Sequence, residues 1–218
     1  VVADVGSGTG ILTELLLRHG NTVFGIEPNA DMRAAAERLL REYPAFRSIA
    51  GVAERTTLLT ASVDWITAGQ AFHWFDVDFS RQEFARILRR GDEASARGWV
   101  ALMWNNRRED SPFLEEYEQF LREFGTDYVA VKHQGVESDG RLERFFDRGK
   151  FVLRSFANRQ SFDFEGVKGR TLSASYMPAE DHPRYATMLA ALERVFARHA
   201  DGGRVEFAYD TRVYVGRL

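Results

Sequence analysis

Asp4-Val5-Gly6-Ser7-Gly8-Thr9-Gly10 follows an apolar run that begins at Val1 and precedes an amphipathic segment. The glycines allow the backbone to approach a ligand where a Cβ atom would clash, and the N-terminus of the following helix presents unpaired N–H groups. Glu27 ends a second apolar run, and a carboxylate there can accept hydrogen bonds from the hydroxyls of a ribose. The pattern therefore predicts a cofactor that contains a nucleoside.

The spacing of the glycines distinguishes between such cofactors. It is G-x-G-x-G, and Ile11 stands where the pyrophosphate-binding pattern G-x-G-x-x-G has its third glycine. A dinucleotide is thus the less suitable ligand, which weakens the hypothesis that the protein is a nucleotide-dependent oxidoreductase.

The first half of the chain alternates between apolar runs and amphipathic segments. We expect strands over residues 1–5, 22–26, 46–50, 63–68 and 99–104. Their alternation with helices implies right-handed crossovers and a parallel sheet covered on both faces, which is an α/β fold. Ligands bind such sheets at the carboxyl ends of the strands, where the sequence places Gly6, Glu27, Glu54, Gln70 and Asn105.

Three helices are expected between these strands. The first ends at Gly20, and its buried face is predicted to be Ile11, Leu12, Leu15 and Leu16. Asn29 is predicted to cap the second, and Pro44 to end it after a buried face of Met32, Ala36, Leu39, Leu40 and Tyr43. Ser80 and Glu83 have the spacing of a capping box for the third, which is predicted to bury Phe84, Ile87 and Leu88.

The second half has a different character. Ser111-Pro112 is predicted to begin a helix that ends at Gly125 and carries Phe113, Tyr117, Phe120, Leu121 and Phe124. A polar stretch, 126–149, follows, and we interpret this region as a cap inserted after the fifth strand. A strand is then expected within 151–164, a helix from Pro183 and a strand at 205–209. We expect a single domain, 1–218, with a cofactor-binding core over 1–110, cap and late core elements over 111–200, and a terminal strand over 201–218.

The composition excludes several functions. The chain of 218 residues is 44% hydrophobic, which suits one sizeable core. Its net charge is −3 and its basic residues are scattered, so nucleic acid is an unsuitable partner. The absence of cysteine removes thiolate chemistry, and the five histidines lack metal-ligand spacing, so no metal is expected. No apolar run approaches the roughly 20 residues of a membrane span, and we expect a cytoplasmic protein.

Four ordered motifs resemble those of a known family. Residues 2–10 resemble the first motif of class I S-adenosylmethionine-dependent methyltransferases, and residues 23–29 the second. Residues 51–54 with 62–75, and residues 169–178, are similar to a type 11 (UbiE-like) subgroup that acts on small molecules. The resemblance implies a Rossmann-like, mostly parallel sheet of seven strands with one antiparallel strand near its end. It also implies S-adenosylmethionine as cofactor and in-line methyl transfer to a small-molecule acceptor.

Family members place a leading segment before the first strand, whereas Val1 already lies in that strand here and is not a methionine. We interpret the N-terminus as truncated.

The resemblance implies roles for individual residues. The cofactor is expected to contact Asp4, Gly6, Ser7, Gly8, Gly10, Glu27, Pro28, Ala53, Glu54, Gln70 and Ala71. The substrate is expected to contact His73, Trp74, Asn105, Arg107 and Tyr176, of which His73 and Tyr176 are the candidate catalytic residues.

Several of these roles have alternatives. His73 could accept a proton from a hydroxyl or amine, bind a carboxylate when protonated, or only pack. Arg107 could pair with an acidic substrate. Tyr176 could enclose the substrate or hydrogen-bond its leaving proton, or only complete the cap. A module that binds the cofactor or a partner without catalysis would have the same fold.

Overall fold

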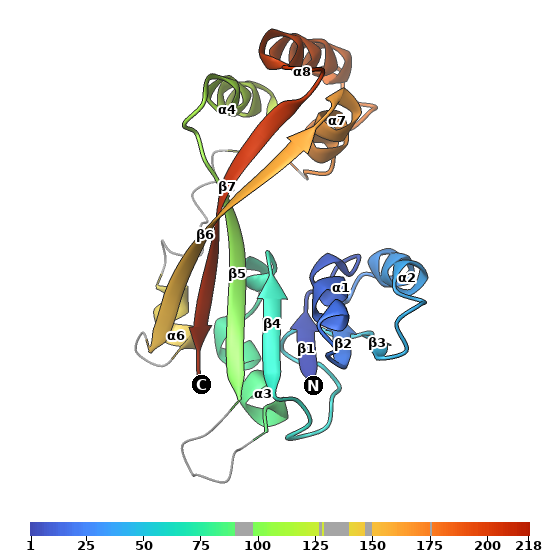
Figure 1. Cartoon of the computed structure of the whole chain (residues 1–218), viewed down its shortest axis with the longest axis vertical. Coiled ribbons are helices and arrows are strands. Elements are labelled where there is room, and N and C mark those ends of the chain that lie inside the picture. Colours follow the sequence, from blue (N-terminus) through green and yellow to red (C-terminus); the bar gives the residue numbers. More distant parts are fainter. Residues whose placement is uncertain (90–97, 127, 129–139, 147–149, 175) are drawn as a thin grey trace. The chain divides into compact units, whose positions relative to one another are not determined.

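The computed structural model describes residues 1–89, 98–126, 128, 140–146, 150–174 and 176–218 (Figure 1). The strands are β1 (Val2–Val5), β2 (Val23–Ile26), β3 (Phe46–Ile49), β4 (Trp65–Gly69), β5 (Trp99–Arg107), β6 (Phe151–Phe162) and β7 (Val205–Gly216). The described helices are α1 (Ile11–Arg18), α2 (Ala30–Leu39), α3 (Val77–Ile87), α4 (Pro112–Phe124), α6 (Arg141–Phe145), α7 (Phe164–Leu172) and α8 (Tyr185–His199). A short 3₁₀ helix, η1 (Phe72–Trp74), follows β4.

The strands form one seven-stranded sheet in the order β3-β2-β1-β4-β5-β7-β6. Strands β1 to β5 pair in parallel. Strand β7 runs antiparallel to β5, since Arg108 N donates to Ala208 O while Asn105 accepts from Thr211. The predicted mostly parallel sheet with an antiparallel strand near its end is confirmed.

Helices cover both faces of the sheet, as the sequence predicts. Val2 of β1 packs in one cluster with Leu17 of α1 and Leu40 beside α2. Its neighbour Ala3 belongs to a different cluster, which includes residues of α3 and α6. Successive strand residues point to opposite faces, so the two clusters lie on opposite sides of the sheet.

The chain divides into two compact units, and each is described by itself. The first comprises Val1–Trp104, Val136–Ser155 and Arg212–Leu218, and the second comprises Asn105–Gly135 and Phe156–Thr211. The segment predicted to hold the cap and late core elements, 111–200, overlaps the second unit without coinciding with it, because α6 belongs to the first. Residues 127, 129–139 and 147–149 of the predicted polar stretch lie outside the described residues.

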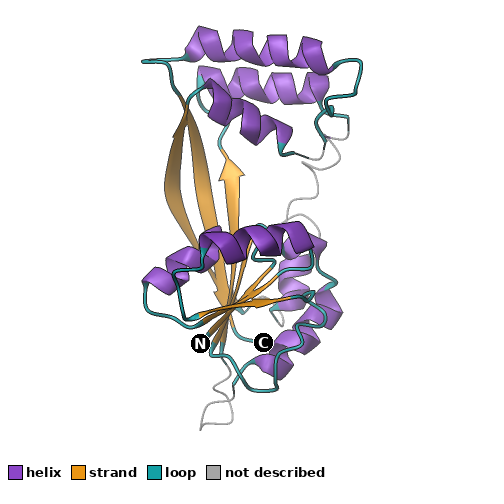
Figure 2. Ribbon diagram, turned by 90° about the vertical axis from the view of Figure 1, so that its right-hand side faces the viewer, coloured by secondary structure: helices purple, strands orange, loops and turns teal. Residues whose placement is uncertain are grey.

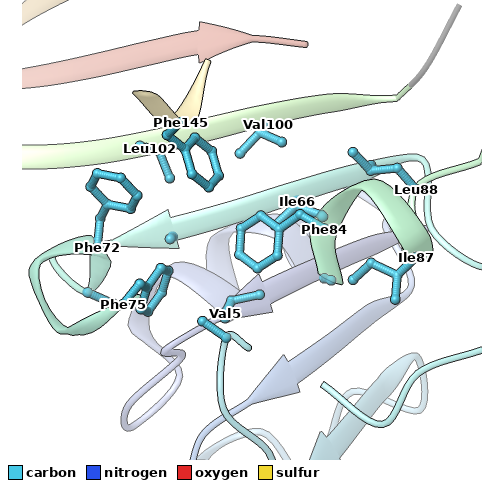
Figure 3. Close-up of a cluster of buried hydrophobic side chains, with 14 of the residues drawn as sticks. Val5, Ile66, Phe72, Phe75, Phe84, Ile87, Leu88, Val100, Leu102 and Phe145 are labelled. Carbon is cyan, nitrogen blue, oxygen red and sulfur yellow. The ribbon is translucent and has the colours of Figure 1, made fainter. Parts of the chain in front are cut away.

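The core of the first unit explains the assignment of α6. Phe145 is fully buried, and its ring lies 5.0 Å from that of Phe72 and 5.7 Å from that of Phe84 (Figure 3). Helix α6 is therefore part of the core of the first unit, although it lies within the stretch that the sequence marks as polar.

The second unit has an aromatic core of its own. Helix α8 packs against both α4 and α7 (Figure 2). Phe207 of β7 is fully buried, and its ring lies 5.1 Å from Phe113 and 5.0 Å from Tyr117 of α4. The apolar face predicted for α4 is confirmed, and Ser111 caps that helix by accepting from Leu114 N.

The structure corrects two predicted helix faces. In α1 the buried residues are Thr13 and Leu17, whereas Ile11 and Leu15 are 77% and 51% exposed. In α2, Ala36 and Leu40 are buried as predicted, but Met32 and Leu39 are exposed. Nearly every turn of α1 offers an apolar residue, so periodicity alone does not select the face that meets the sheet.

The predicted capping box of the third helix is wrong. Asp76 caps α3 instead and accepts from the N–H groups of Asp78 and Phe79. Ser80 lies within the helix, and Glu83 accepts from Thr56 and Arg86. The buried face of Phe84, Ile87 and Leu88 is nevertheless as predicted.

Candidate functional site

The glycine loop joins β1 to α1, and each of its glycines has a positive φ: 70° at Gly6, 56° at Gly8 and 91° at Gly10. A Cβ on Gly6 would lie 2.4 Å from Ala71 Cβ, and one on Gly10 would lie 2.7 Å from Leu40 Cδ1. A Cβ on Gly8 would meet no described atom within 4 Å. Two of the glycines thus permit close packing within the protein, while Gly8 faces open space that a ligand can enter.

Glu27 closes the loop from the end of β2. Its side chain is almost fully buried; Oε2 accepts from Gly8 N at 3.0 Å and Oε1 accepts from Asn29 N at 2.9 Å. A carboxylate has about four acceptor positions, so each oxygen keeps capacity for one more hydrogen bond. Asn29 caps α2 as predicted, by accepting from Asp31 N and Met32 N.

Asp4 lies beneath the loop and is 1% exposed. Its carboxylate accepts from Thr13 Oγ1 of α1 at 2.6 Å and from Thr67 Oγ1 of β4 at 3.0 Å. Burial raises the pKa of Asp4 to about 6, although the two hydroxyl donors oppose this shift. The carboxyl therefore ties α1 and β4 to the strand that carries the glycine loop.

The remaining predicted cofactor contacts lie on three neighbouring segments. Ala53 is buried, and Glu54 Oε1 accepts from Asp76 N at 2.7 Å, at the start of α3. Pro28 is exposed beside Glu27. Gln70 follows β4 with a φ of 58°, and non-glycine residues adopt that conformation mainly where the surrounding structure imposes it. These residues follow β2, β3 and β4, whose carboxyl ends lie at the same edge of the sheet as the end of β1 that leads into the glycine loop.

His73 lies in η1, directly after Gln70 and Ala71. Its ring centroid is 4.6 Å from that of Trp74 and 5.2 Å from that of Trp104. Burial and the nearby Arg141 lower the pKa of His73, so its imidazole is neutral at pH 7. Its buried Nδ1 has no hydrogen-bond partner among the described residues, whereas Trp74 is 79% exposed.

The other predicted substrate contacts belong to the second unit. Asn105 Oδ1 accepts from Thr211 Oγ1 at 2.6 Å. Arg107 donates through Nη2 to Glu118 Oε2 at 2.6 Å and to the hydroxyl of Tyr128 at 2.8 Å. Tyr176 is half-buried, with its ring centroid 5.1 Å from that of Tyr128. Arg107 is predicted to pair with an acidic substrate. Its guanidinium already has the Glu118 carboxylate as a partner within the chain.

Sequence analysis missed three residues that shape the first-unit site. Thr13 and Thr67 bind Asp4, and Arg141 donates to the carbonyls of His73 at 3.0 Å and Phe75 at 2.9 Å. Thr13 lies at a helix position predicted to face away from the sheet. Arg141 is 68 residues from His73 in the chain, and no local signal connects them.

No helix among the described residues has the length and apolarity that a membrane crossing needs. The same residues include no group of three or more His, Cys, Asp or Glu side chains arranged to hold a metal ion.

Comparison with known proteins shows which sequences this chain resembles. Residues 3–94 match the model of a family described as a methyltransferase domain. An uncharacterized methyltransferase of Mycobacterium tuberculosis is 33% identical over 120 residues, which are 55% of this chain and 46% of that protein. An uncharacterized methyltransferase of Schizosaccharomyces pombe is 27% identical over 121 residues, 55% of this chain and 45% of that protein. The chain spans about half the length of the curated relatives that it matches.

Solved structures share the fold over the whole chain. A protein of Anaeromyxobacter dehalogenans, assigned as a type II methyltransferase, superposes with a TM-score of 0.71 at 20% identity, covering 99% of this chain and 88% of that one. Geranyl diphosphate C-methyltransferase of Streptomyces coelicolor, solved with Mg²⁺, geranyl diphosphate and S-adenosyl-L-homocysteine, gives 0.53 at 14% identity, covering 100% and 70%.

The sheet order and the glycine loop define the class I methyltransferase fold. Within that class, the match of residues 3–94 to the methyltransferase domain model confirms the predicted resemblance to type 11 methyltransferases.

Proposed function

We propose that the protein transfers a methyl group from S-adenosylmethionine to a small-molecule acceptor. The observation that carries the proposal is the open space at Gly8, beside a Glu27 carboxylate that its own backbone leaves half satisfied. A glycine backbone that a ligand can approach, next to a carboxylate held in place, suits the ribose of S-adenosylmethionine and the methionine part attached to it.

The residues of the first unit fit this cofactor. Glu27 is held at both oxygens by backbone N–H groups, so it would accept from ribose hydroxyls without reorganising. Ala53 and Glu54 would meet the adenine, and Gly6, Ser7, Gly10, Pro28, Gln70 and Ala71 would complete the surrounding wall. S-adenosylmethionine, when bound, supplies an electrophilic methyl group on a sulfonium. No metal or covalent enzyme intermediate is needed for this transfer, and the protein's main tasks are orientation and exclusion of water.

His73 is the proposed proton acceptor. Its pKa is lowered by burial first and by Arg141 second, so the neutral form predominates at pH 7 and can take a proton from a hydroxyl or amine. Nδ1 has no partner among the described residues, which is consistent with an acceptor position reserved for a ligand. The alternative is that His73 only packs between Trp74 and Trp104.

Trp74, Asn105, Arg107 and Tyr176 remain proposed substrate contacts. Burial raises the pKa of the Tyr176 hydroxyl, so this group would donate a hydrogen bond and would not act as a base at neutral pH. A cytoplasmic location and the absence of a nucleic-acid partner remain predictions from composition.

The test has two parts. Calorimetry with S-adenosylmethionine should show one site, and NADH should show none; binding of NADH alone would replace the proposal by the oxidoreductase hypothesis. Incubation with methyl-labelled cofactor and a panel of carboxylate, phenol and amine acceptors should then label at least one of them. Binding without transfer to any acceptor would favour the non-catalytic module. In a parallel reaction, His73→Gln should lower kcat with little change in cofactor affinity.

A further inference from the structure

The second unit contains a group of side chains that the proposed mechanism uses only in part. We define the arginine–tyrosine cluster as Arg107, Tyr117, Arg170, Tyr176 and Tyr209. These residues come from β5, α4, α7, the segment after α7, and β7, and all lie within the second unit. Arg170 and Tyr176 also belong to the segment 169–178 that the sequence analysis singled out.

Ring contacts connect four members of the cluster, and Tyr176 adjoins them through the ring of Tyr128, whose hydroxyl accepts from Arg107. The guanidinium of Arg107 lies 5.1 Å from the ring centroid of Tyr117. The guanidinium of Arg170 lies 5.1 Å from the ring of Tyr209 and 5.2 Å from that of Phe207, which in turn contacts Tyr117. The cluster is thus a continuous set of aromatic faces with two cations against them.

Hydrogen-bond donors in this cluster lack acceptors. The Tyr209 hydroxyl and Arg107 Nε are both buried, and neither has a hydrogen-bond partner among the described residues. Burial raises the pKa of Tyr209 to about 12, so its hydroxyl remains a donor at neutral pH. Native proteins pair the great majority of buried polar groups, so two orphaned donors in one cluster indicate an acceptor that is supplied from outside the chain.

The charge of Arg170 points in the same direction. Arg107 of the cluster is paired with Glu118, which also accepts from Arg122 Nε at 2.9 Å. Arg170 has neither an ion pair nor a hydrogen bond with any residue that the structure describes, although it is half-buried. A partly desolvated guanidinium normally has a carboxylate or phosphate partner.

We propose that Arg170, with the Tyr209 hydroxyl and Arg107 Nε, binds the carboxylate of a small organic acid whose apolar body lies beside Tyr176, the ring of the cluster that is partly exposed. Among the described residues of the cluster, Arg170 is the cation without a carboxylate partner, and its planar guanidinium suits the two oxygens of a carboxylate. Arg170 is partly exposed, whereas the Tyr209 hydroxyl and Arg107 Nε are buried. The inference rests on the proposed function, for which it names the class of the methyl acceptor.

The test compares acids with their neutral amides, which have almost the same shape. The full chain is titrated with three pairs of compounds: benzoate and benzamide, phenylacetate and phenylacetamide, and cinnamate and cinnamamide. The heat of binding and the midpoint of thermal unfolding are measured for each compound. At least one acid should bind about tenfold or more tightly than its amide, the effect expected of hydrogen bonds to a charged group. Equal behaviour of acids and amides across all three pairs, or equal binding of inorganic sulfate, would overturn the proposal.

Variants locate the effect within the cluster. Arg170→Gln and the conservative Arg170→Lys should remove most of the preference for the acid, whereas Arg194→Gln, at an exposed position on α8, should not. Tyr209→Phe should weaken acid binding about fivefold to tenfold without lowering the thermal midpoint of the free protein. Unchanged acid binding in both Arg170→Gln and Tyr209→Phe would refute the assignment.

A separate readout distinguishes this inference from the proposed function. Titration of the same variants with S-adenosylhomocysteine should give the wild-type affinity, because the cofactor residues lie in the first unit. If acids bind and S-adenosylhomocysteine does not, the proposed methyl transfer fails while the anion site stands. If S-adenosylhomocysteine binds and no acid does, only the anion site fails.

Discussion

The glycine loop of the first unit and the arginine–tyrosine cluster of the second differ in how their buried polar groups are satisfied. In the loop, both oxygens of Asp4 and both oxygens of Glu27 have donors from the protein itself. In the cluster, Tyr209 and Arg107 retain donors without described acceptors. The carboxylates of the first site are therefore held in place before a ligand binds, while the buried donors of the second gain acceptors only when a ligand binds.

The largest expected effect tests the close packing of the loop. Gly6→Ala would place a Cβ 2.4 Å from Ala71 Cβ at a φ of 70°. Left-handed strain and overpacking together should cost about 4 kcal/mol of unfolding free energy. Gly8→Ala shares the positive φ but has no described neighbour within 4 Å, so it should cost only about 1 kcal/mol. Urea unfolding measures both, and equal losses would show that Gly8 does not face open space.

The next effect tests the cost of burying the Asp4 carboxylate, which is hydrogen-bonded to two threonines. The folded-state pKa of Asp4 is about 6 against an ordinary value of 3.8, so the folded protein holds this proton more tightly than the unfolded chain does. The corresponding stability is fully present below about pH 4 and is lost as the pH rises through about 6. A pKa difference of this size corresponds to about 3 kcal/mol of unfolding free energy.

Asp4→Asn removes that titration while keeping an acceptor for one of the two threonines. The unfolding free energy of the variant relative to the wild type should therefore shift by about 3 kcal/mol in favour of the variant between pH 4 and pH 7. Denaturant unfolding at a series of pH values provides the measurement. A difference that does not vary with pH would mean that Asp4 titrates normally.

The smallest effect tests the cluster against a matched tyrosine. The Tyr117 hydroxyl donates to Thr171 Oγ1 at 2.9 Å, so Tyr117→Phe should lose about 1 kcal/mol. Tyr209→Phe removes a buried hydroxyl without a described partner, so stability in the absence of ligand should stay the same or increase slightly. Urea midpoints of the two variants, measured side by side, should separate. An equal loss would show that Tyr209 has an acceptor within the chain.

The two regions also differ in how far the sequence predicts them. The loop is encoded locally, because Gly6, Gly8, Gly10 and Glu27 lie at the ends of short apolar runs that mark adjacent parallel strands. Their positions follow from the chain order and from the rule that such strands end at one edge of the sheet. The parallel pairing of β1 to β5 and the cap of α2 at Asn29 are accessible to the same reasoning.

The errors arise where a long-range contact selects among equivalent local patterns. In α1, Ile11 and Leu15 of the face predicted to be buried are exposed, because the face with Thr13 meets the sheet and reaches Asp4. In α3 the predicted Ser80 cap competes with Asp76, and the cap at Asp76 is the one that forms. The Arg107–Glu118 pair and the approach of Arg170 to Tyr209 depend on tertiary packing that no spacing in the sequence announces.

The central claim, that the loop and Glu27 form the cofactor site, is tested most directly by calorimetric titration of S-adenosylmethionine into the wild type, Glu27→Ala and Glu37→Ala. Glu37 is an exposed carboxylate on α2 and serves as the matched control. Loss of hydrogen bonds to a charged group contributes about 1.5–3 kcal/mol, so Glu27→Ala should bind about 10- to 100-fold more weakly while Glu37→Ala matches the wild type. Wild-type affinity in a folded Glu27→Ala variant would contradict the account.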